Sequence, residues 1–273
     1  MRAILQTFLG HLDDIEANVK LVGQLRALGA ATAPPSSVRG RLGKAANDVR
    51  GTVLSQRTWE TIALDGSLLF LAAQYEVTVR DLIQEMMRRK CQTIVVYTDL
   101  PEELRTENTR LVGELLRTGS RDPTVDQIQV VEEFLRCNKR GKPVAVYYQG
   151  FSHHEHNLAP DELKRLMNRA GVNEFWPRVC RDPTLQTELN CGGVDAAVAA
   201  ARSVLLQFIL DRNAISHRGP SYQTIGASVL IEYIRFFRHF MPALVRALES
   251  HLAEMQGRVV QTARGRRRTG QRS

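Results

Sequence analysis

Apolar residues along this chain recur mainly every three or four positions, the spacing expected when one face of a helix is buried. Alternation at every second position is much rarer. Only residues 93–97 and 143–148 form convincing β-type runs, and two such short runs do not make a sheet. The sequence therefore predicts an all-α protein, a helical bundle with peripheral helices and short irregular or β-type segments.

Periodicity, capping residues and prolines place the individual elements. The predicted helices cover residues 4–28, 58–90, 102–117, 123–136, 160–170, 194–217 and 224–256. Gly171 should stop the helix that precedes it, and residues 173–185 should form a capped, loop-rich connection. The last two helices are joined by a turn that contains Gly219 and Pro220, so they are expected to pack as an antiparallel hairpin.

Breaks in the pattern suggest three parts. Pro34 and Pro35 cannot lie within a helix, so residues 1–50 are predicted to be an N-terminal helix and a linker. Residues 51–257 are predicted to form one helical domain. Residues 258–273 hold six arginines and no acid, and are predicted to be a disordered tail that either contacts nucleic-acid phosphates or is simply a solvated end.

Composition narrows the class of protein. With 43% hydrophobic and 24% charged residues, the chain has the composition of a soluble globular protein. No apolar run approaches the roughly 20 residues of a membrane span, and the N-terminus lacks a cleavable signal, so a cytoplasmic protein without membrane contact is expected. The four cysteines are too widely spaced for a zinc knuckle and are expected to be free thiols.

The strongest candidate for chemistry lies at the end of the helix predicted for residues 194–217. The segment reads RNAISH, with Arg212 five positions before His217, and Asn213 four before it on the same helical face. Asn213 is therefore placed to fix the orientation of the imidazole. Spacing alone is not specific, because Arg246 and His251 form a second pair of the same kind.

Two other groups are weaker candidates. The histidine-rich segment at residues 152–156 suggests a metal site, but neighbouring histidines on a loop point in different directions and no distant ligand is identifiable, so no metal is predicted. Glu76 and Arg80 lie four apart on a predicted helix, as in an ordinary helical ion pair, although a role at the active-site face is the alternative.

The segment from Arg212 to Gly219 resembles the RNxIxH(x)G signature of HEPN domains. The resemblance includes the long helices on either side of the motif. It extends to LDGSLLFLAAQYEVTVRDLIQEMMRRK and NLAPDELKRLMNRAGV, which are similar to segments of RiboL-PSP-type HEPN proteins. It covers about residues 55–257. It implies a HEPN-like helical bundle that forms a homodimer and cleaves RNA without a metal ion or cofactor, in a bacterial defence or toxin-antitoxin system.

The resemblance also implies roles for individual residues. His217 would transfer protons, since histidine titrates near neutral pH. Arg212 would neutralise the phosphorane, and Asn213 would orient His217 or contact the phosphate. The neighbours Asp211, Ser216 and Arg218 would help to bind the substrate. The products would be a 2′,3′-cyclic phosphate and a 5′-hydroxyl, and an unrestrained ribonuclease implies a cognate antitoxin or regulatory partner protein.

Two other functions fit the same sequence. One is a non-catalytic HEPN binding or scaffold module that acts with a partner protein. The retention of Arg212, Asn213 and His217 together favours catalysis over that alternative. The other is a helical regulator that holds nucleic acid through its arginine-rich tail, but the sequence has no recognisable helix-turn-helix pattern.

Overall fold

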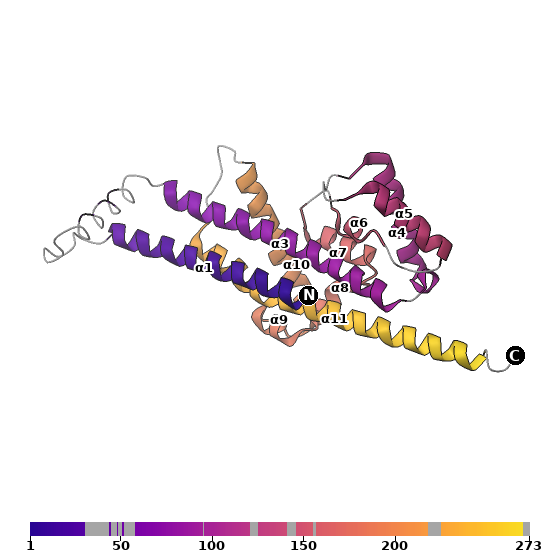
Figure 1. The fold of residues 1–273 in the computed structure, drawn as a ribbon. Coiled ribbons are helices and arrows are strands. Elements are labelled where there is room, and N and C mark those ends of the chain that lie inside the picture. The colour runs from indigo at the N-terminus through magenta and orange to yellow at the C-terminus, as the bar shows by residue number, and fades with distance from the viewer. Residues whose placement is uncertain are drawn as a thin grey trace.

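The chain forms a helical bundle, and its all-α class is confirmed by a computed structural model (Figure 1). The structure describes residues 1–30, 44, 48, 51, 58–94, 96–120, 125–140, 146–154, 157–217 and 225–269. Within these residues there is no strand. Ile94 and Val146 are extended or irregular, and Tyr97 and Tyr148 begin a 3-10 turn and a short helix, so the described parts of both β-type runs are not strands.

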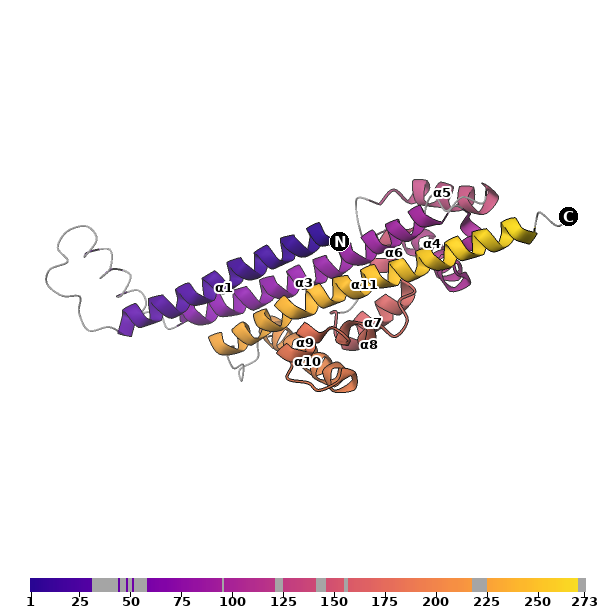
Figure 2. The same cartoon turned by 90° about the horizontal axis from the view of Figure 1, so that it is seen from below.

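Three long helices run side by side and form the body of the bundle (Figures 1 and 2). They are α1 (Arg2–Ala30), α3 (Thr58–Thr93) and α11 (Ala227–Thr269). The apolar stripe of α1 is buried against the other two, and Arg238 of α11 holds Asp13 and Glu16 of α1 at 2.7 Å each. The N-terminal helix is therefore part of the same core as the rest of the bundle.

Helix α3 supplies the centre of the core. Leu68, Leu71, Tyr75, Val79 and Leu82 are fully buried, at the spacing of one helical face. By length and composition alone, the stretch Trp59–Thr93 is apolar enough to cross a membrane, but half of its most apolar window is buried inside the bundle. Core helices of globular domains share that property.

Shorter helices pack along the body and around one of its ends (Figures 1 and 2). They are α4 (Glu102–Thr118), α5 (Gln127–Arg140), α6 (Tyr148–Ser152), α7 (Pro160–Arg169), α8 (Phe175–Cys180), α9 (Pro183–Glu188) and α10 (Val194–Ser216). Gly171 follows α7 with a φ of 77°, a left-handed conformation that favours glycine, which confirms the predicted stop. The predicted loop-rich connection is instead two short helices, α8 and α9, in which Asp182 caps α9.

Helices α10 and α11 pair only near the segment that joins them. Phe208 packs on Phe237 at 4.8 Å between ring centroids, and Asp211 bonds Tyr233, which is the order of an antiparallel pair. Farther from that segment α8 and α9 contact both helices, so the expected hairpin does not extend along their whole length. The predicted turn at residues 218–221 lies outside the described residues.

The arginine-rich tail differs from its prediction. Helix α11 continues to Thr269, well past the predicted end near residue 256, and extends beyond the shorter helices (Figure 1). Pro242 lies within this helix. Only residues 270–273 of the predicted disordered tail, like Pro34, Pro35 and Pro123, lie outside the described residues.

Candidate active site

The predicted site is at the C-terminal end of α10. Phe208, Ile209 and Ile215 bury one side of the helix, which fixes its rotation and leaves the polar residues of the motif toward the surface. The helix ends at Ser216, and the backbone N–H of the capping residue His217 donates to the carbonyl of Asn213 at 3.0 Å. Arg212 and Asn213 are half-buried one turn earlier, while Ser216 and His217 are exposed.

Asn213 is the hydrogen-bonding centre of this site. Its Oδ1 accepts a bond from Nη1 of Arg212 at 3.2 Å and another from Nδ2 of Asn157 at 2.6 Å. Asn157 lies just before α7, far from the motif in sequence. Among the described residues, no side-chain bond joins Asn213 to His217, and the Asn213 side chain contacts Arg212 and Asn157 instead.

The charge of Arg212 meets a neutral partner. Among the residues that the structure describes, its side chain bonds the amide of Asn213 and forms no ion pair with a carboxylate. The second Arg–His pair behaves differently, because Nε of Arg246 lies 2.6 Å from a carboxylate oxygen of Asp182. Two arginines with the same spacing to a histidine thus differ in their partners, because within the described part of the chain Arg246 pairs with a carboxylate and Arg212 does not.

His217 is exposed, and no side-chain hydrogen bond or ion pair ties it to the described part of the chain. Beside it, the hydroxyl of Ser216 donates to the carbonyl of Arg212 at 3.2 Å, a bond back along the helix. Arg218, predicted to bind substrate, lies outside the described residues. The imidazole of His217 is therefore open to a ligand.

Asp211 has partners of its own. One carboxylate oxygen accepts from the hydroxyl of Tyr233 on α11 at 2.5 Å, and the other accepts from Nε2 of Gln207 at 2.7 Å. Burial raises the pKa of the Tyr233 phenol well above its usual range, and the bond to Asp211 raises it further. Asp211 therefore ties α10 to α11, a contact that competes with the substrate-binding role expected for it.

Two residues of this arrangement were not predicted, Asn157 and Tyr233. Asn157 begins the segment that carries the family resemblance before α7, but nothing in its neighbourhood marks a polar role. Tyr233 lies within an aromatic run of α11 that predicts core packing. Both reach the site only through tertiary contacts.

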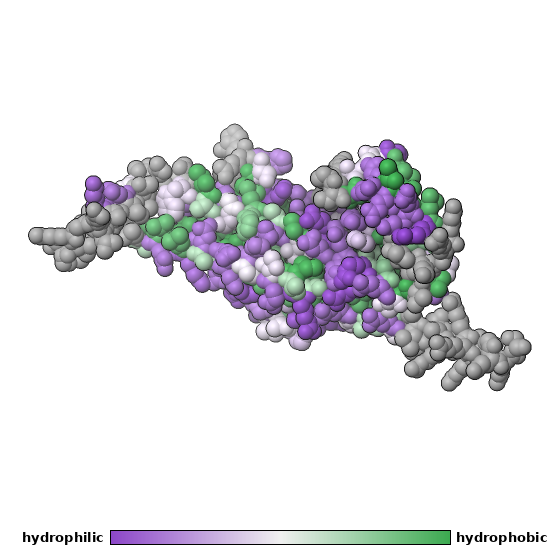
Figure 3. All heavy atoms as spheres, in the orientation of Figure 1, coloured by the Kyte–Doolittle hydropathy of each residue, from purple (hydrophilic) through white to green (hydrophobic). Residues whose placement is uncertain are grey.

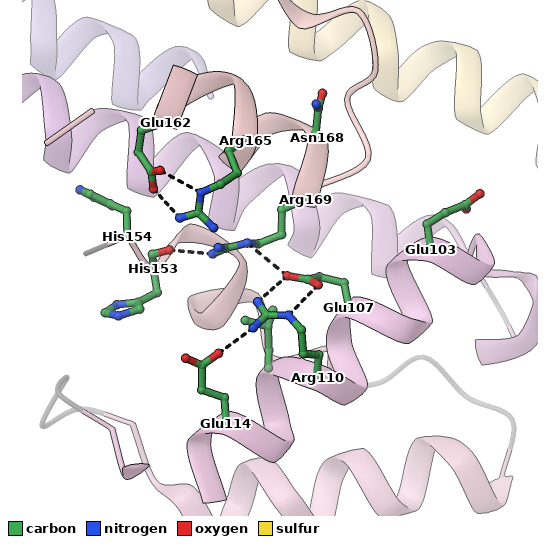
Figure 4. A pocket seen from close by; sticks show the side chains of 11 residues that line it. Glu103, Glu107, Arg110, Glu114, His153, His154, Glu162, Arg165, Asn168 and Arg169 are labelled. Atoms are coloured by element: carbon green, nitrogen blue, oxygen red, sulfur yellow. Dashed lines mark hydrogen bonds and ion pairs between the residues drawn. The ribbon is translucent and has the colours of Figure 1, made fainter. Parts of the chain in front are cut away.

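The weaker candidates do not join this site. His153 and His154 line a separate cavity of about 710 Å³ between α4 and α7 (Figure 4), and Glu155 and His156 lie outside the described residues. Within the described residues, no cluster of three or more His, Cys, Asp or Glu side chains is suited to a metal ion. Arg80 contacts Asp81 at 3.4 Å, so the predicted Glu76–Arg80 pair is replaced by another.

Comparison with known proteins identifies the family. Residues 51–250, most of the chain, match the family model of RiboL-PSP-HEPN. The matched range includes α3, α10 and the whole RNAISH segment. No curated protein and no solved structure matches the chain.

Proposed function

The chain belongs to the RiboL-PSP-HEPN family, and on that premise we propose that it is an endoribonuclease that cleaves RNA without a metal ion at the end of α10. The family suggests a ribonuclease. One observation supports catalysis by this chain in particular: Arg212 is held by a neutral amide and not by a carboxylate among the described residues, next to an exposed His217. A cation without a counter-ion beside an accessible imidazole is suited to a phosphodiester.

The proposed reaction uses the RNA's own nucleophile. His217 accepts the proton of the 2′-hydroxyl, the 2′-oxygen bonds to phosphorus, and the bond from phosphorus to the 5′-oxygen breaks as that oxygen gains a proton. The products are a 2′,3′-cyclic phosphate and a 5′-hydroxyl. Because one imidazole accepts a proton while another group donates one, His217 of the partner subunit is the proposed proton donor.

Arg212 is proposed to stabilise the charge that builds up on phosphorus. In the phosphorane, the non-bridging oxygens carry more negative charge than in the substrate, so a guanidinium nearby lowers the barrier. Bonding to Asn213 leaves most of the donors of Arg212 available, because only Nη1 is engaged by a described residue.

A homodimer is proposed on the basis of the exposed face of α10. Leu206 and Leu210 are 46% and 51% exposed, and with Asn213 and His217 they lie four, three and four residues apart along one face of the helix. On α3, Ile62 is also an exposed apolar side chain, at 61%. Hydrophobic patches are visible over α3 and α10 in Figure 3. A second copy that covered this face would bring two His217 side chains together.

The reaction is tested with purified protein and total RNA in EDTA. The wild type should cleave, and His217→Ala and Arg212→Ala should each lose about 100-fold to 1,000-fold in rate. Arg246→Ala is the matched control, because it removes the arginine of the second Arg–His pair, and it should stay within about threefold of wild type. Equal cleavage by all four proteins would reject the proposed site.

The proposed dimer is tested by introducing a charged side chain on the exposed face of α10. Leu210→Glu should give a monomer in sedimentation or light scattering and should lose cleavage with it, since an acid on each copy disfavours burial. Leu116→Glu on α4, where the leucine is 62% exposed, is the matched control and should change neither property. An unchanged dimer with Leu210→Glu would place the interface elsewhere.

The cellular setting remains part of the proposal. A cytoplasmic ribonuclease of a defence or toxin-antitoxin system needs a cognate antitoxin or other regulator, and growth arrest on induction of the wild type but not of His217→Ala is the expected result. The alternative is a non-catalytic HEPN module that acts with a partner protein. That alternative would be favoured if both proteins arrested growth equally while RNA stayed intact.

A further inference from the structure

We propose that Asn157 is a positioning residue that fixes the side-chain amide of Asn213, so that Nδ2 of Asn213 faces the reacting phosphate of the RNA as a hydrogen-bond donor. This inference rests on the proposed function, because it concerns the same site. It adds a residue outside the motif and gives Asn213 one defined orientation.

The orientation of Asn213 follows from the chemistry of arginine. A guanidinium donates hydrogen bonds and accepts none, so the Asn213 atom that lies 3.2 Å from Nη1 of Arg212 is the oxygen. The atom of Asn157 that lies 2.6 Å from the same oxygen is then its amide nitrogen, because two oxygens would repel each other. The two contacts therefore determine the direction of both amides.

The nitrogen of Asn213 is left facing the other way. Among the described residues, no acceptor contacts Nδ2 of Asn213, so its two N–H groups are available. If the amide were reversed, both bonds to Oδ1 would be lost and the NH₂ group would face a guanidinium. The two donors together therefore favour the observed orientation, and the loss of either one weakens that preference.

Direction matters because the substrate is an anion. An N–H donor near the phosphate stabilises the charge that develops in the transition state, whereas a carbonyl oxygen in the same place repels it. Arg212 alone does not fix the orientation of the Asn213 amide, because the guanidinium of Arg212 is also proposed to contact the phosphate. Asn157 supplies the second hydrogen-bond donor to Oδ1 of Asn213 and does not itself contact the substrate.

Asn157 is held through the residue that follows it. The next residue, Leu158, is buried and its carbonyl accepts from the hydroxyl of Tyr75 on α3 at 3.2 Å. The backbone carbonyl of Asn157 accepts from the N–H of Ala159 at 2.7 Å. Tyr75 also packs against Phe208 of α10, with ring centroids 6.3 Å apart. The core that places α10 therefore also places Asn157, as a positioning residue requires.

The test compares three variants. Asn157→Ala removes the second donor, and Asn157→Asp replaces it with an acceptor that favours the reversed amide of Asn213. Asn168→Asp is the matched control, because Asn168 is an exposed asparagine on α7 that lines the separate cavity. Circular dichroism and thermal melting establish that each variant is folded.

The kinetic readout is the division between kcat and KM for a fluorogenic single-stranded RNA in EDTA. Asn157→Ala should lower kcat about 10-fold and Asn157→Asp about 100-fold, with KM changed less than threefold, since the amide acts mainly in the transition state. Asn168→Asp should match wild type. A folded Asn157→Asp protein with the kcat of wild type would overturn the proposal.

A spectroscopic readout separates this proposal from the proposed function. The side-chain NH₂ signal of Asn213, identified by its loss in Asn213→Ser, should shift in both Asn157 variants and stay in place in Asn168→Asp. If the wild type does not cleave RNA, the proposed function is rejected, while the shift of the Asn213 signal still tests whether Asn157 orients Asn213. If the wild type cleaves RNA but the Asn213 signal is unchanged in the Asn157 variants, the positioning role of Asn157 is rejected and the proposed function is retained.

Discussion

Two polar regions of this molecule contain arginines and histidines but use them differently. In the cavity between α4 and α7, the guanidiniums of Arg110, Arg165 and Arg169 are each paired with a glutamate (Figure 4). At the end of α10, Arg212 bonds an amide and His217 is open. The cavity between α4 and α7 thus has more charged side chains than the end of α10, but its arginines are already paired with glutamates.

The paired charges connect helices. Arg169, whose side chain is only 9% exposed, lies 3.2 Å from Glu107 of α4 and donates to the carbonyl of His153 after α6. The bond from Arg110 holds the pKa of Glu107 below its usual range, while burial lowers the pKa of Arg169. These interactions stabilise the packing of α4 against α7. The arginines of this cavity are therefore engaged in packing, whereas Arg212 has no carboxylate partner among the described residues.

Replacing an arginine by methionine should affect mainly cleavage at the end of α10 and mainly stability in the cavity. The largest expected effect is the loss of cleavage. Arg212→Met should reduce RNA cleavage about 100-fold to 1,000-fold, because a donor to the phosphorane is lost. Its free energy of unfolding should change by less than about 0.5 kcal/mol, since no described carboxylate loses a partner. Cleavage rates and urea denaturation measure the two quantities on one protein sample.

Arg169→Met should give the reverse result. The free energy of unfolding should fall by about 1 to 2 kcal/mol, because the half-buried bonds of Arg169 to Glu107 and to the carbonyl of His153 are lost while Glu107 keeps Arg110 as a partner. Cleavage by the folded fraction should fall less than for Arg212→Met. If Arg169→Met instead abolished cleavage and left stability unchanged, the functions of the two regions would have to be exchanged.

Lys90 provides a pH-dependent test of how charge is stabilised outside the site. Its ammonium is buried and donates to the carbonyl of Ala170 at 2.6 Å, where α7 ends, and burial lowers its pKa to about 7. The unfolded chain keeps that proton up to about pH 10, so the unfolded state binds more protons between these values and stability rises with pH.

The expected gain attributable to Lys90 is about 1 to 2 kcal/mol between pH 7 and about pH 8.5. Lys90→Met should lack this increment and also lose the bond to Ala170. Denaturation of both proteins across that range gives the difference directly, which removes the effect of other groups. Parallel curves would show that Lys90 stays charged in the folded protein.

Most of the fold was predictable because its signals are local. The three-and-four spacing of apolar residues gave α3, α4, α7 and α10 nearly to their ends, and Gly171 gave the end of α7. Where the apolar stripe gives way to arginines after residue 257, composition predicted disorder, but the helical backbone of α11 continues. Composition indicates which residues can be buried and says less about whether a helical backbone continues.

The site was predictable only in the part that is contiguous in sequence. Arg212, Asn213 and His217 are neighbours on one helix, and the motif contains all three. Asn157 reaches Asn213 from 56 residues away, through the packing of α3, α7 and α10. The different partners of Arg212 and Arg246 are likewise tertiary facts. Sequence spacing finds candidate groups, whereas the fold decides which of them are paired.

Tyr233 offers a smaller effect at the edge of the site. Tyr233→Phe removes the hydroxyl that bonds Asp211, and water can replace it because Asp211 is only half-buried. The free energy of unfolding should fall by about 1 kcal/mol, with cleavage within about threefold of wild type. A loss of cleavage as large as that of Arg212→Met, without a matching loss of stability, would return Asp211 to the substrate-binding role.

The smallest effect is expected for an outer pair of the charged cavity. Glu114 of α4 lies 2.8 Å from Arg110, one turn away, and both side chains are about half exposed. Arg110 also has Glu107, so Glu114→Gln should cost only about 0.3 to 0.5 kcal/mol, and less in high salt. Comparing the stability lost in Arg169→Met and in Glu114→Gln shows whether the cavity is stabilised by its buried ion pairs or by its total charge. A cost for Glu114→Gln that approached that of Arg169→Met would favour total charge, and a ligand that carries charge would then compete for this cavity as well.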